Sequence, residues 1–276
     1  MTPLIGPTGA PDLHVMTFNV RRRLPALAAR PADRWRLRRP RVQALLRAER
    51  PTLLGVQETL PDQAAAISDA LGASYRFIGH GRQPGPRGEA SPLFYDTDRL
   101  ELLQWRQQAL SDRPDEPGSV SWGNLLPRVL VQATFRDLAT SAVFLAVNTH
   151  LDAFSARARV RAAQEISGLV ADQPWPAIVT GDLNAGPDSE PVRELLSGDT
   201  LVDAWTAASA TLTPEWGTYG GYRDPRPGRR IDWIAVSPRI AVQSAGINAQ
   251  SIDGGWPSDH LPVQAVVRMP QPEGTA

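Results

Sequence analysis

Four carboxylates, two histidines and two asparagines stand at or beside the ends of short apolar runs in this chain. They are Glu58, Asp182, Asp232, Asp259, His150, His260, Asn19 and Asn184. An oxygen-rich set without cysteine favours Mg²⁺ or Mn²⁺ over zinc, and magnesium is usually held by one or two carboxylates together with substrate phosphates. Such a set suits hydrolysis of a phosphate ester, in which a metal neutralises developing charge and an activated water attacks phosphorus.

Four of the apolar runs end where these polar residues begin. Residues 13–18 precede Asn19, residues 53–56 precede Gln57 and Glu58, residues 142–147 precede Asn148 to His150, and residues 177–180 precede Gly181 to Asn184. Short apolar runs bounded by turn residues predict buried strands. Helical spacing within 33–50 and 155–171 predicts one helix between the first two strands and another between the last two. Such crossovers bring successive strand ends to one edge of a sheet, where ligands collect.

Two later runs have the opposite arrangement, because their polar residues come first. Asp232 lies at the start of the run 231–236, and Asp259 and His260 directly precede the run 261–267. These strands must run antiparallel to the first four if their polar residues are to reach the same edge. With further strand candidates, the count approaches ten or more, against three or four helices. We therefore predict an α/β fold, a four-layer α/β/β/α sandwich of two packed mixed β-sheets flanked by helices.

The chain is organised as one unit. With 276 residues it can bury a sizeable core without disulfide staples. We predict a flexible leader over 1–12, a single domain over 13–269 and a flexible tail over 270–276. Stretches rich in glycine and proline at 79–92, 111–118 and 217–228 are predicted loops of a length that often borders a site.

The composition excludes several kinds of chemistry. The chain has no cysteine, which excludes disulfides, thiolate zinc sites and cysteine nucleophiles. All 29 basic residues are arginines, so no lysine is present for a nucleotide-hydrolase phosphate loop or a Schiff base. Residues 1–12 lack a basic start and an apolar core, and no apolar run approaches ~18 residues. We therefore expect a cytoplasmic protein with no membrane span, and a monomer.

The charges balance over the whole chain but not locally. Residues 21–50 contain 11 arginines against two acids, Asp33 and Glu49, which is a local excess of nine positive charges. Either a solvated helix face or a positive rim that attracts a phosphate-bearing substrate accounts for this excess. Arg21, the first of these arginines, is a candidate for lining a substrate cleft.

Six short motifs together resemble the ordered motif set of the endonuclease/exonuclease/phosphatase superfamily, which has the deoxyribonuclease-I-like fold. They are Phe18-Asn19-Val20, Val56-Gln57-Glu58, Asn148-Thr149-His150-Leu151-Asp152, Gly181-Asp182-Leu183-Asn184, Arg230-Ile231-Asp232 and Ser258-Asp259-His260. They occur in the order typical of that superfamily and extend over nearly the whole chain. In detail the sequence is similar to a bacterial branch of uncharacterised hydrolases, whose further elements match Gly81-Arg82, Phe94-Tyr95 and Pro127-Arg128.

The resemblance implies a metal site. Glu58 would be the principal ligand of Mg²⁺ or Mn²⁺, with Asn19 and Asp259 close to the same ion. Whether one or two ions act, and which group is the general base, stay open at this point.

The resemblance also implies roles around the phosphate. Asp182 would orient or deprotonate the attacking water, and Asn184 would hold that water or a phosphate oxygen. His260 would contact the phosphate as a general acid/base or charge stabiliser, with Asp232 fixing its tautomer. A carboxylate partner of this kind favours the protonated imidazole. His150 would donate to the phosphate from the opposite side.

Three further residues are candidate substrate contacts. Tyr95 and Arg128 would reach the phosphate or order the site, with packing at a strand end as the alternative. Arg82 lies in a predicted loop and would clamp the substrate, because arginine grips phosphate through two parallel hydrogen bonds. A solvated arginine is the alternative there.

Several functions remain in competition. The first is a metal-dependent phosphodiesterase or nuclease, of 3′-exonuclease or endonuclease type, although zero net charge lacks the basic footprint of a duplex-binding protein. The second is a phosphatase or phosphodiesterase of a small molecule, such as an inositol or sugar phosphate. A non-catalytic binding relative should have lost site positions that this chain retains. A serine hydrolase is disfavoured because the chain has no Gly-x-Ser-x-Gly elbow.

Overall fold

Two six-stranded sheets form the centre of the molecule. The computed structural model describes residues 1–25 and 28–270. The first sheet has the order β13 (Ala241–Ile247), β14 (Val263–Arg268), β1 (Asp12–Asn19), β2 (Leu53–Gln57), β6 (Leu93–Asp96) and β3 (Tyr75–Ile78). The second has the order β11 (Val202–Asp203), β12 (Asp232–Val236), β10 (Ala177–Asp182), β9 (Val143–His150), β8 (Val129–Asp137) and β7 (Leu100–Ala109). A small hairpin of β4 (Gly81–Gln83) and β5 (Arg87–Ala90) stands apart from both.

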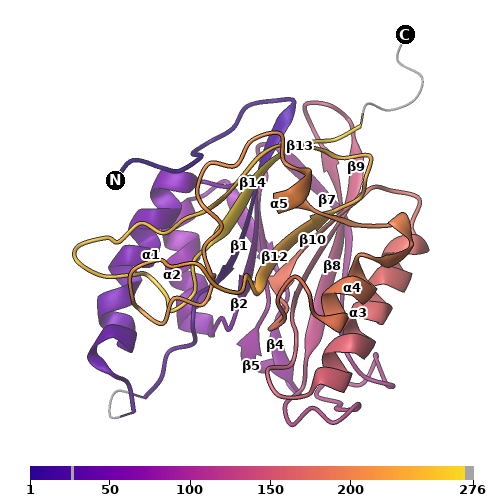
Figure 1. Cartoon of the computed structure of the whole chain (residues 1–276), viewed down its shortest axis with the longest axis horizontal. Coiled ribbons are helices and arrows are strands. Elements are labelled where there is room, and N and C mark those ends of the chain that lie inside the picture. Colours follow the sequence, from indigo (N-terminus) through magenta and orange to yellow (C-terminus); the bar gives the residue numbers. More distant parts are fainter. Residues whose placement is uncertain (26–27, 271–276) are drawn as a thin grey trace.

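Helices cover the outer faces of the two sheets. Figure 1 shows α1 (Trp35–Glu49) and α2 (Pro61–Leu71) on one side, and α3 (Ala156–Ala171) and α4 (Glu190–Leu195) on the other. Three short helical segments complete the fold: α5 (Ala204–Ala207) and the 3₁₀ turns Pro31–Asp33 and Ser197–Asp199. The predicted four-layer α/β/β/α sandwich is confirmed. No helix among the described residues is long and apolar enough to cross a bilayer.

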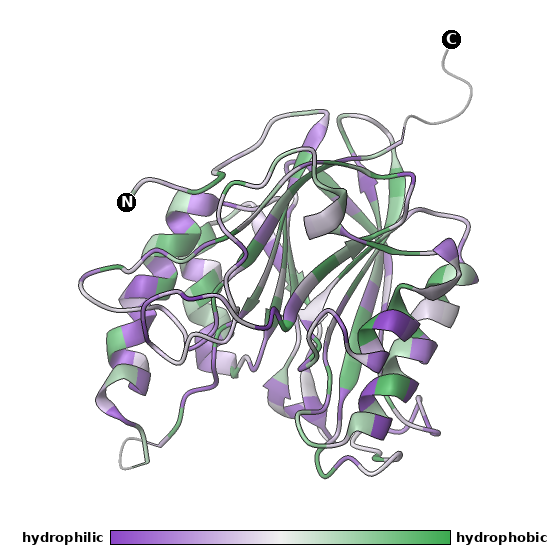
Figure 2. Cartoon of the chain, viewed as in Figure 1, coloured by the Kyte–Doolittle hydropathy of each residue, from purple (hydrophilic) through white to green (hydrophobic). Residues whose placement is uncertain are grey.

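Alternation along the strands builds three apolar layers. In β1, Leu13 and Val15 face the second sheet, while Met16 and Phe18 face α1 and α2. Successive side chains of a strand point to opposite faces, so a strand buried on both sides must be apolar throughout. Figure 2 shows the result as hydrophobic strands between helices whose outer faces are hydrophilic. Because Asn19 follows this alternation, its side chain lies on the face that meets the second sheet.

Strand direction brings the predicted polar residues to one rim. β1 and β2 are parallel, as are β9 and β10, each pair joined through a helix. β14 runs antiparallel to β1, and β12 runs antiparallel to β10. The register places Asp182 beside His150 on one side and Asp232 on the other. The predicted antiparallel course of the two later strands is therefore confirmed.

A polar contact joins the two sheets just beneath that rim. The buried Asn148 of β9 donates to the carbonyl oxygen of Val56 in β2 at 2.9 Å, and its Oδ1 accepts from Gln57 Nε2 at 2.7 Å. Thr180 of β10 donates to the same Oδ1 at 3.1 Å. Gly55 allows this approach, because a Cβ at that position would collide with Thr180 Oγ1 and Asn148 Oδ1. Because Gly55 has no Cβ, the two sheets can approach each other closely near the rim.

The structure adds elements that the sequence patterns did not predict. Helix α2 begins with Pro61 at its first position, where proline costs no hydrogen bond, and buries Ile67 and Leu71. In the expected leader, the backbone amides of Leu4, Ile5 and Gly6 donate to the buried carboxylate of Glu49 at 2.6, 3.2 and 3.0 Å. The predicted division into leader, domain and tail stays a prediction, and residues 271–276 of the expected tail lie outside the described residues.

Candidate active site

A cleft of about 360 Å³ opens at the rim where the strand ends meet. Its lining includes Glu58, Asp182, Asp259, His150, His260, Asn184, Arg21, Arg22, Arg82, Arg128, Glu89, Leu126, Phe154 and Tyr219. Six of the eight residues predicted for metal binding and catalysis therefore face one cavity. The other two, Asn19 and Asp232, are buried and hydrogen-bonded to residues that line it.

Asp182 lies at the centre of this group. Its Oδ2 accepts a hydrogen bond from Asn19 Nδ2 at 2.9 Å and lies 3.6 Å from His150 Nε2 and 3.8 Å from His260 Nε2. Burial, reinforced by the nearby carboxylate of Asp232, raises the pKa of Asp182 to about 7. A carboxylate with such a pKa can accept a proton near neutral pH.

His260 is held by Asp232. Its Nδ1 donates to Asp232 Oδ2 at 2.9 Å, which leaves Nε2 facing Asp182 and the cleft. Burial disfavours the imidazolium, but the charges of Asp232 and Asp182 outweigh burial and raise the pKa of His260 well above its ordinary value. Tyr219 packs edge-on against the imidazole, with ring centroids 5.2 Å apart. His260 is therefore a fixed, positively charged donor at neutral pH.

His150 has the opposite protonation behaviour. Burial and the positive charge of Arg128 lower its pKa well below the ordinary value, so the ring is neutral at pH 7. Asn184 Nδ2 lies 3.1 Å from His150 Nε2 and donates to the carbonyl oxygen of Leu151 at 3.0 Å. The backbone amide of Asn184 donates to Asp182 Oδ1 at 2.9 Å. Asn184 thus positions both a histidine and a carboxylate, and its own backbone is left-handed, with φ of 49°.

Glu58 and Asp259 form a second acidic group in the cleft. Glu58 Oε1 accepts from Asn19 Nδ2 at 3.1 Å, and its Oε2 accepts from the backbone amide of Arg22 at 3.1 Å. Burial alone would raise the pKa of Glu58, but electrostatic interaction with the imidazoles of His150 and His260, with these two hydrogen bonds, lowers it to about 2. Glu58 is therefore ionised at neutral pH.

The donors of this second group fit a hard divalent cation. Glu58 and Asp259 supply carboxylate oxygen atoms, as Mg²⁺ and Mn²⁺ prefer, and Asn19 adds an amide oxygen, which accepts from the backbone amide of Arg21 at 2.9 Å. Asp182, Asp232 and His260 also have potential ligand atoms within 4.8 Å of one another. Asp232 Oδ2 and His260 Nδ1 are already bonded to each other, however, so a metal at those atoms would have to break that pair. The first set is the better fit, because the hydrogen bond from Asn19 Nδ2 leaves the Glu58 carboxylate further lone pairs for a metal, whereas Nδ1 of His260 has only one.

Two of the three predicted substrate contacts reach the cleft. Arg82 lies on β4, is 7% exposed and pairs with Glu89 at 3.0 Å. Arg128 directly precedes β8 and is 6% exposed, and its Nε lies 3.5 Å from Asp152 Oδ2. Its Nη1 is buried without a hydrogen-bond partner among the described residues. Because burying an unpaired charged donor is costly, a hydrogen bond from this atom to an anion that entered the cleft would be favourable.

The structure does not bring Tyr95 to the cleft. Tyr95 lies on β6 opposite Leu53, at the start of β2, whereas Glu58 follows the end of β2. Its ring packs against Phe135 in the core between the sheets, with centroids 4.9 Å apart. Tyr95 therefore has the packing role at a strand end that was the alternative to a substrate contact.

Other cleft residues were not singled out by the sequence patterns. Glu89 pairs with both Arg22 and Arg82, and Phe154 and Tyr219 are exposed at the cleft. Glu89 and Tyr219 lie in the stretches 79–92 and 217–228, whose loop composition was a signal for a site border. Residue type alone could not distinguish them from other loop residues.

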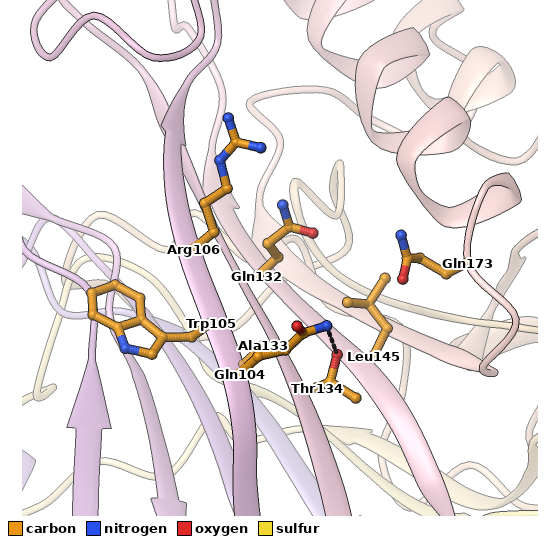
Figure 3. Close-up of a pocket in the computed structure, with 8 residues that line it drawn as sticks. All are labelled: Gln104, Trp105, Arg106, Gln132, Ala133, Thr134, Leu145 and Gln173. Carbon is orange, nitrogen blue, oxygen red and sulfur yellow. Dashed lines mark hydrogen bonds between the residues drawn. The ribbon is translucent and has the colours of Figure 1, made fainter.

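A separate depression of about 340 Å³ lies on the outer face of the second sheet (Figure 3). Its lining is Gln104, Trp105, Arg106, Gln132, Ala133, Thr134, Leu145 and Gln173, and Gln104 Nε2 donates to Thr134 Oγ1 at 3.3 Å. This set contains no carboxylate and no histidine. It therefore offers no acid–base or metal chemistry comparable to that of the cleft.

Comparison with known proteins identifies a family. The model of the Endonuclease/Exonuclease/phosphatase family matches residues 16–260 of this chain. No curated protein sequence matches it. The matched segment includes every residue predicted for metal binding and catalysis.

Solved structures share the fold over nearly the full length. A Bacteroides thetaiotaomicron protein of the endonuclease/exonuclease/phosphatase family is 28% identical, with a TM-score of 0.87 over 95% of this chain and 99% of that one. A mannosyl-6-phosphatase from the same organism is 29% identical, with a TM-score of 0.84 over 92% and 99%. The human Nocturnin catalytic domain, at 19% identity and a TM-score of 0.69 over 93% of each chain, shares the fold.

Proposed function

Because this chain belongs to the endonuclease/exonuclease/phosphatase family, we propose that it is a Mg²⁺- or Mn²⁺-dependent hydrolase of small phosphate esters, such as a sugar phosphate. One observation carries the proposal. Asp182 lies 3.6 and 3.8 Å from two imidazoles, in the same cleft as the buried Arg128, whose Nη1 has no hydrogen-bond partner within residues 1–25 and 28–270.

The cationic groups of the cleft would bind the phosphoryl group. Arg128 offers Nη1, and Arg82 supplies a second buried guanidinium in the same cavity. Guanidinium groups hold phosphate through charge-assisted hydrogen bonds, which gain strength away from water. Exposed rim groups such as Phe154 would contact the alcohol part of the ester.

The two protonation states around Asp182 suit attack by water. Asp182 would accept the proton of the attacking water as the bond from phosphorus to the alcohol oxygen breaks, since a base is most effective when its pKa lies near the working pH. The alcohol would leave with a proton taken from solvent. His260, charged and fixed by Asp232, would donate from Nε2 to a phosphoryl oxygen as negative charge develops there. The neutral His150, held by Asn184, would contact the phosphoryl group from its own side of Asp182.

Glu58, Asn19 and Asp259 are the residues that would hold the metal. When bound there, Mg²⁺ or Mn²⁺ would neutralise phosphoryl charge and favour ionisation of water. Because all of these residues come from one chain, we propose that the protein acts as a monomer.

Three features support a small substrate. The cleft measures about 360 Å³, which is the size of a small-ligand site. The chain has zero net charge, which disfavours contacts with many phosphates. A relative that is 29% identical over most of this chain is a mannosyl-6-phosphatase.

A phosphodiesterase acting on nucleic acid is the second candidate. Arg22 is exposed at the cleft, and Arg36 and Arg39 are exposed on the neighbouring α1. A strand of nucleic acid leaving the cleft along this surface would meet several positive charges. That interaction would make hydrolysis strongly dependent on salt.

An activity panel tests the two candidates. Sugar phosphates, inositol phosphates, single-stranded RNA and DNA, and abasic duplex are each offered with Mg²⁺ or Mn²⁺, with and without EDTA, between 50 and 300 mM salt. We expect EDTA-sensitive release of phosphate from small esters with little dependence on salt. Faster cleavage of a nucleic acid, with a steep loss at high salt, would favour the second candidate. Undiminished hydrolysis in EDTA would overturn the metal requirement.

A further inference from the structure

Arg21 lies among three carboxylates at the metal-binding end of the cleft. Its Nη1 is 3.6 Å from Glu58 Oε2, and its Nε is 3.6 Å from Asp259 Oδ2 and 3.4 Å from Asp33 Oδ2. One guanidinium therefore contacts both carboxyl groups of the proposed metal site. The side chain is only 29% exposed, so water screens these contacts weakly.

The backbone holds Arg21 in an unusual conformation. Its φ is 53°, in the left-handed region that residues other than glycine adopt at a cost. Its amide donates to Asn19 Oδ1 at 2.9 Å, and its carbonyl oxygen accepts from Arg38 Nη2 and Gln63 Nε2, each at 2.9 Å. Groups from the end of β1, from α1 and from α2 thus fix one residue.

The two donors that hold Arg21 are themselves fully buried. Arg38 and Gln63 have no exposed surface, and Arg38 also donates to the carbonyl oxygens of Val20 and Asp33, at 2.7 and 3.1 Å. Arg38 Nη1 donates to the carbonyl oxygen of Pro257 as well, at 3.3 Å, so this buried arginine joins the Arg21 loop to the segment that precedes Asp259. The position of the backbone from which the Arg21 side chain reaches Glu58 and Asp259 is therefore built into the fold.

The guanidinium of Arg21 competes with a divalent metal ion for the carboxylates of Glu58 and Asp259. Glu58 and Asp259 would repel each other without a positive charge between them, and the guanidinium supplies that charge permanently. A divalent ion that approaches both carboxylates is repelled by Arg21 or has to displace it. Either effect weakens binding of the ion.

We propose that the Arg21 guanidinium is the resident counter-cation of the Glu58–Asp259 pair and limits the cleft to one weakly held divalent cation. The inference rests on the proposed function only in placing the metal beside Glu58 and Asp259. It concerns the number and affinity of the ions, and hydrolysis is not needed to test it.

Calorimetric titration of the metal-free protein with Mn²⁺ tests the proposal. The wild type is compared with R21Q, with R21K, and with R22Q as a matched control. R22Q removes one positive charge from the same cleft, and the Arg22 side chain pairs with Glu89 instead of the proposed ligands. We expect R21Q to bind Mn²⁺ at least 10-fold more tightly than the wild type, or to bind one more ion. R22Q and R21K should stay within about 3-fold of the wild type.

Thermal unfolding gives a second measurement. In EDTA, R21Q should melt at a lower temperature than the wild type, because three carboxylates lose their shared partner. Mn²⁺ should raise the melting temperature of R21Q more than that of the wild type. If R21Q is unfolded in EDTA, recovery of the fold with Mn²⁺ supports the proposal. Failure to recover while R21K is folded contradicts it.

The proposal is overturned if R21Q binds Mn²⁺ no more tightly than R22Q and with the same number of ions. This result is distinguishable from failure of the proposed function. The latter is measured on the wild type alone, as hydrolysis that is absent or insensitive to EDTA.

Discussion

The imidazole of His260 and the carboxylate of Asp232 share a hydrogen bond of 2.9 Å between Nδ1 and Oδ2, with both side chains buried. The bond joins a residue just before β14 of the first sheet to the first residue of β12 in the second. It fixes which nitrogen of His260 faces Asp182. It also keeps the ring positively charged at a pH where an unpartnered histidine would be largely neutral.

Replacing Asp232 with Asn should weaken catalysis less than removing His260. H260A loses the donor itself, and we expect turnover to fall by roughly 10²- to 10⁴-fold. D232N keeps the donor but lowers the pKa of His260, so we expect a loss of roughly 10- to 100-fold at pH 7. The wild-type rate should fall below about pH 7, where Asp182 becomes protonated, and again in the alkaline range, where His260 loses its proton. D232N should move the alkaline decline to lower pH. A pH–rate profile checks this, and a larger loss in D232N than in a folded H260A would contradict the orienting role.

Asn in place of Asp182 should stabilise the metal-free protein while abolishing turnover. The folded pKa of Asp182, about 7, lies above the ordinary value, so the folded state binds a proton that the unfolded state releases. The free energy of unfolding therefore falls as pH rises from about 4 to about 7. D182N removes the free-energy cost of ionising this buried carboxyl group, and we expect the free energy of unfolding to rise by about 1–4 kcal/mol at pH 8. Denaturant unfolding in EDTA at pH 8 and pH 4 measures it, and an equal gain at both values would count against the pKa assignment.

Arg128→Gln should impair phosphate binding. Nη1 of Arg128 is buried and has no partner among the described residues, so bound phosphate would supply its hydrogen bond. A charge-assisted hydrogen bond contributes about 1.5–3 kcal/mol, so we expect kcat/KM to fall by roughly 10- to 100-fold. Inhibition by inorganic phosphate should weaken in parallel. R136Q on the far part of β8, where Arg136 makes an exposed pair with Glu101, is the control and should leave both values unchanged.

Gly55→Ala should disturb both stability and catalysis. The added methyl group would collide with Thr180 Oγ1 and Asn148 Oδ1, and we expect overpacking to cost about 1–3 kcal/mol. Because Glu58 follows the same strand, turnover should fall as well. The matched control is G168A in α3, where a Cβ would have no neighbour within 4 Å. That change should instead stabilise the helix by about 0.5–1 kcal/mol. Thermal unfolding of both variants distinguishes the two effects.

Much of the site could be predicted because its residues directly follow or precede buried strands. Asn19, Glu58 and Asp182 each stand where an apolar run stops, and the backbone rules for crossovers then bring them to one rim. The separation of two parallel strands by a helix was visible in the spacing of apolar residues. Each of these patterns lies within a short segment, so it can be recognised from the sequence without knowledge of long-range contacts.

Tyr95 shows what such patterns leave undetermined. A buried strand has the same alternation whichever way it runs, so its pattern does not say which end lies near a site. In the structure β6 runs antiparallel to β2, which places Tyr95 beside Leu53 and away from Glu58. The direction follows from the antiparallel pairing of β6 with both β2 and β3, which the residues of β6 alone do not reveal.

The contacts of Arg21 could not be predicted for a different reason. They depend on a left-handed backbone at Arg21 and on donors from α1 and α2 that are distant in sequence. The sequence indicated an excess of arginine and a candidate cleft position. It did not indicate that one arginine would stand between two acids of the same site.

The division of the cleft between the two sheets has a consequence for related proteins. Asn19 and Glu58 lie at the ends of strands of one sheet and Asp182 and His150 at the ends of strands of the other, so their mutual distances depend on how closely the two sheets approach near Gly55. A homologue with a larger side chain at position 55 would need a smaller side chain at position 180. We therefore expect the side-chain volumes at these two positions to vary inversely among homologues. The distances between the site residues of the two sheets would then be kept by paired changes of side-chain volume at positions 55 and 180.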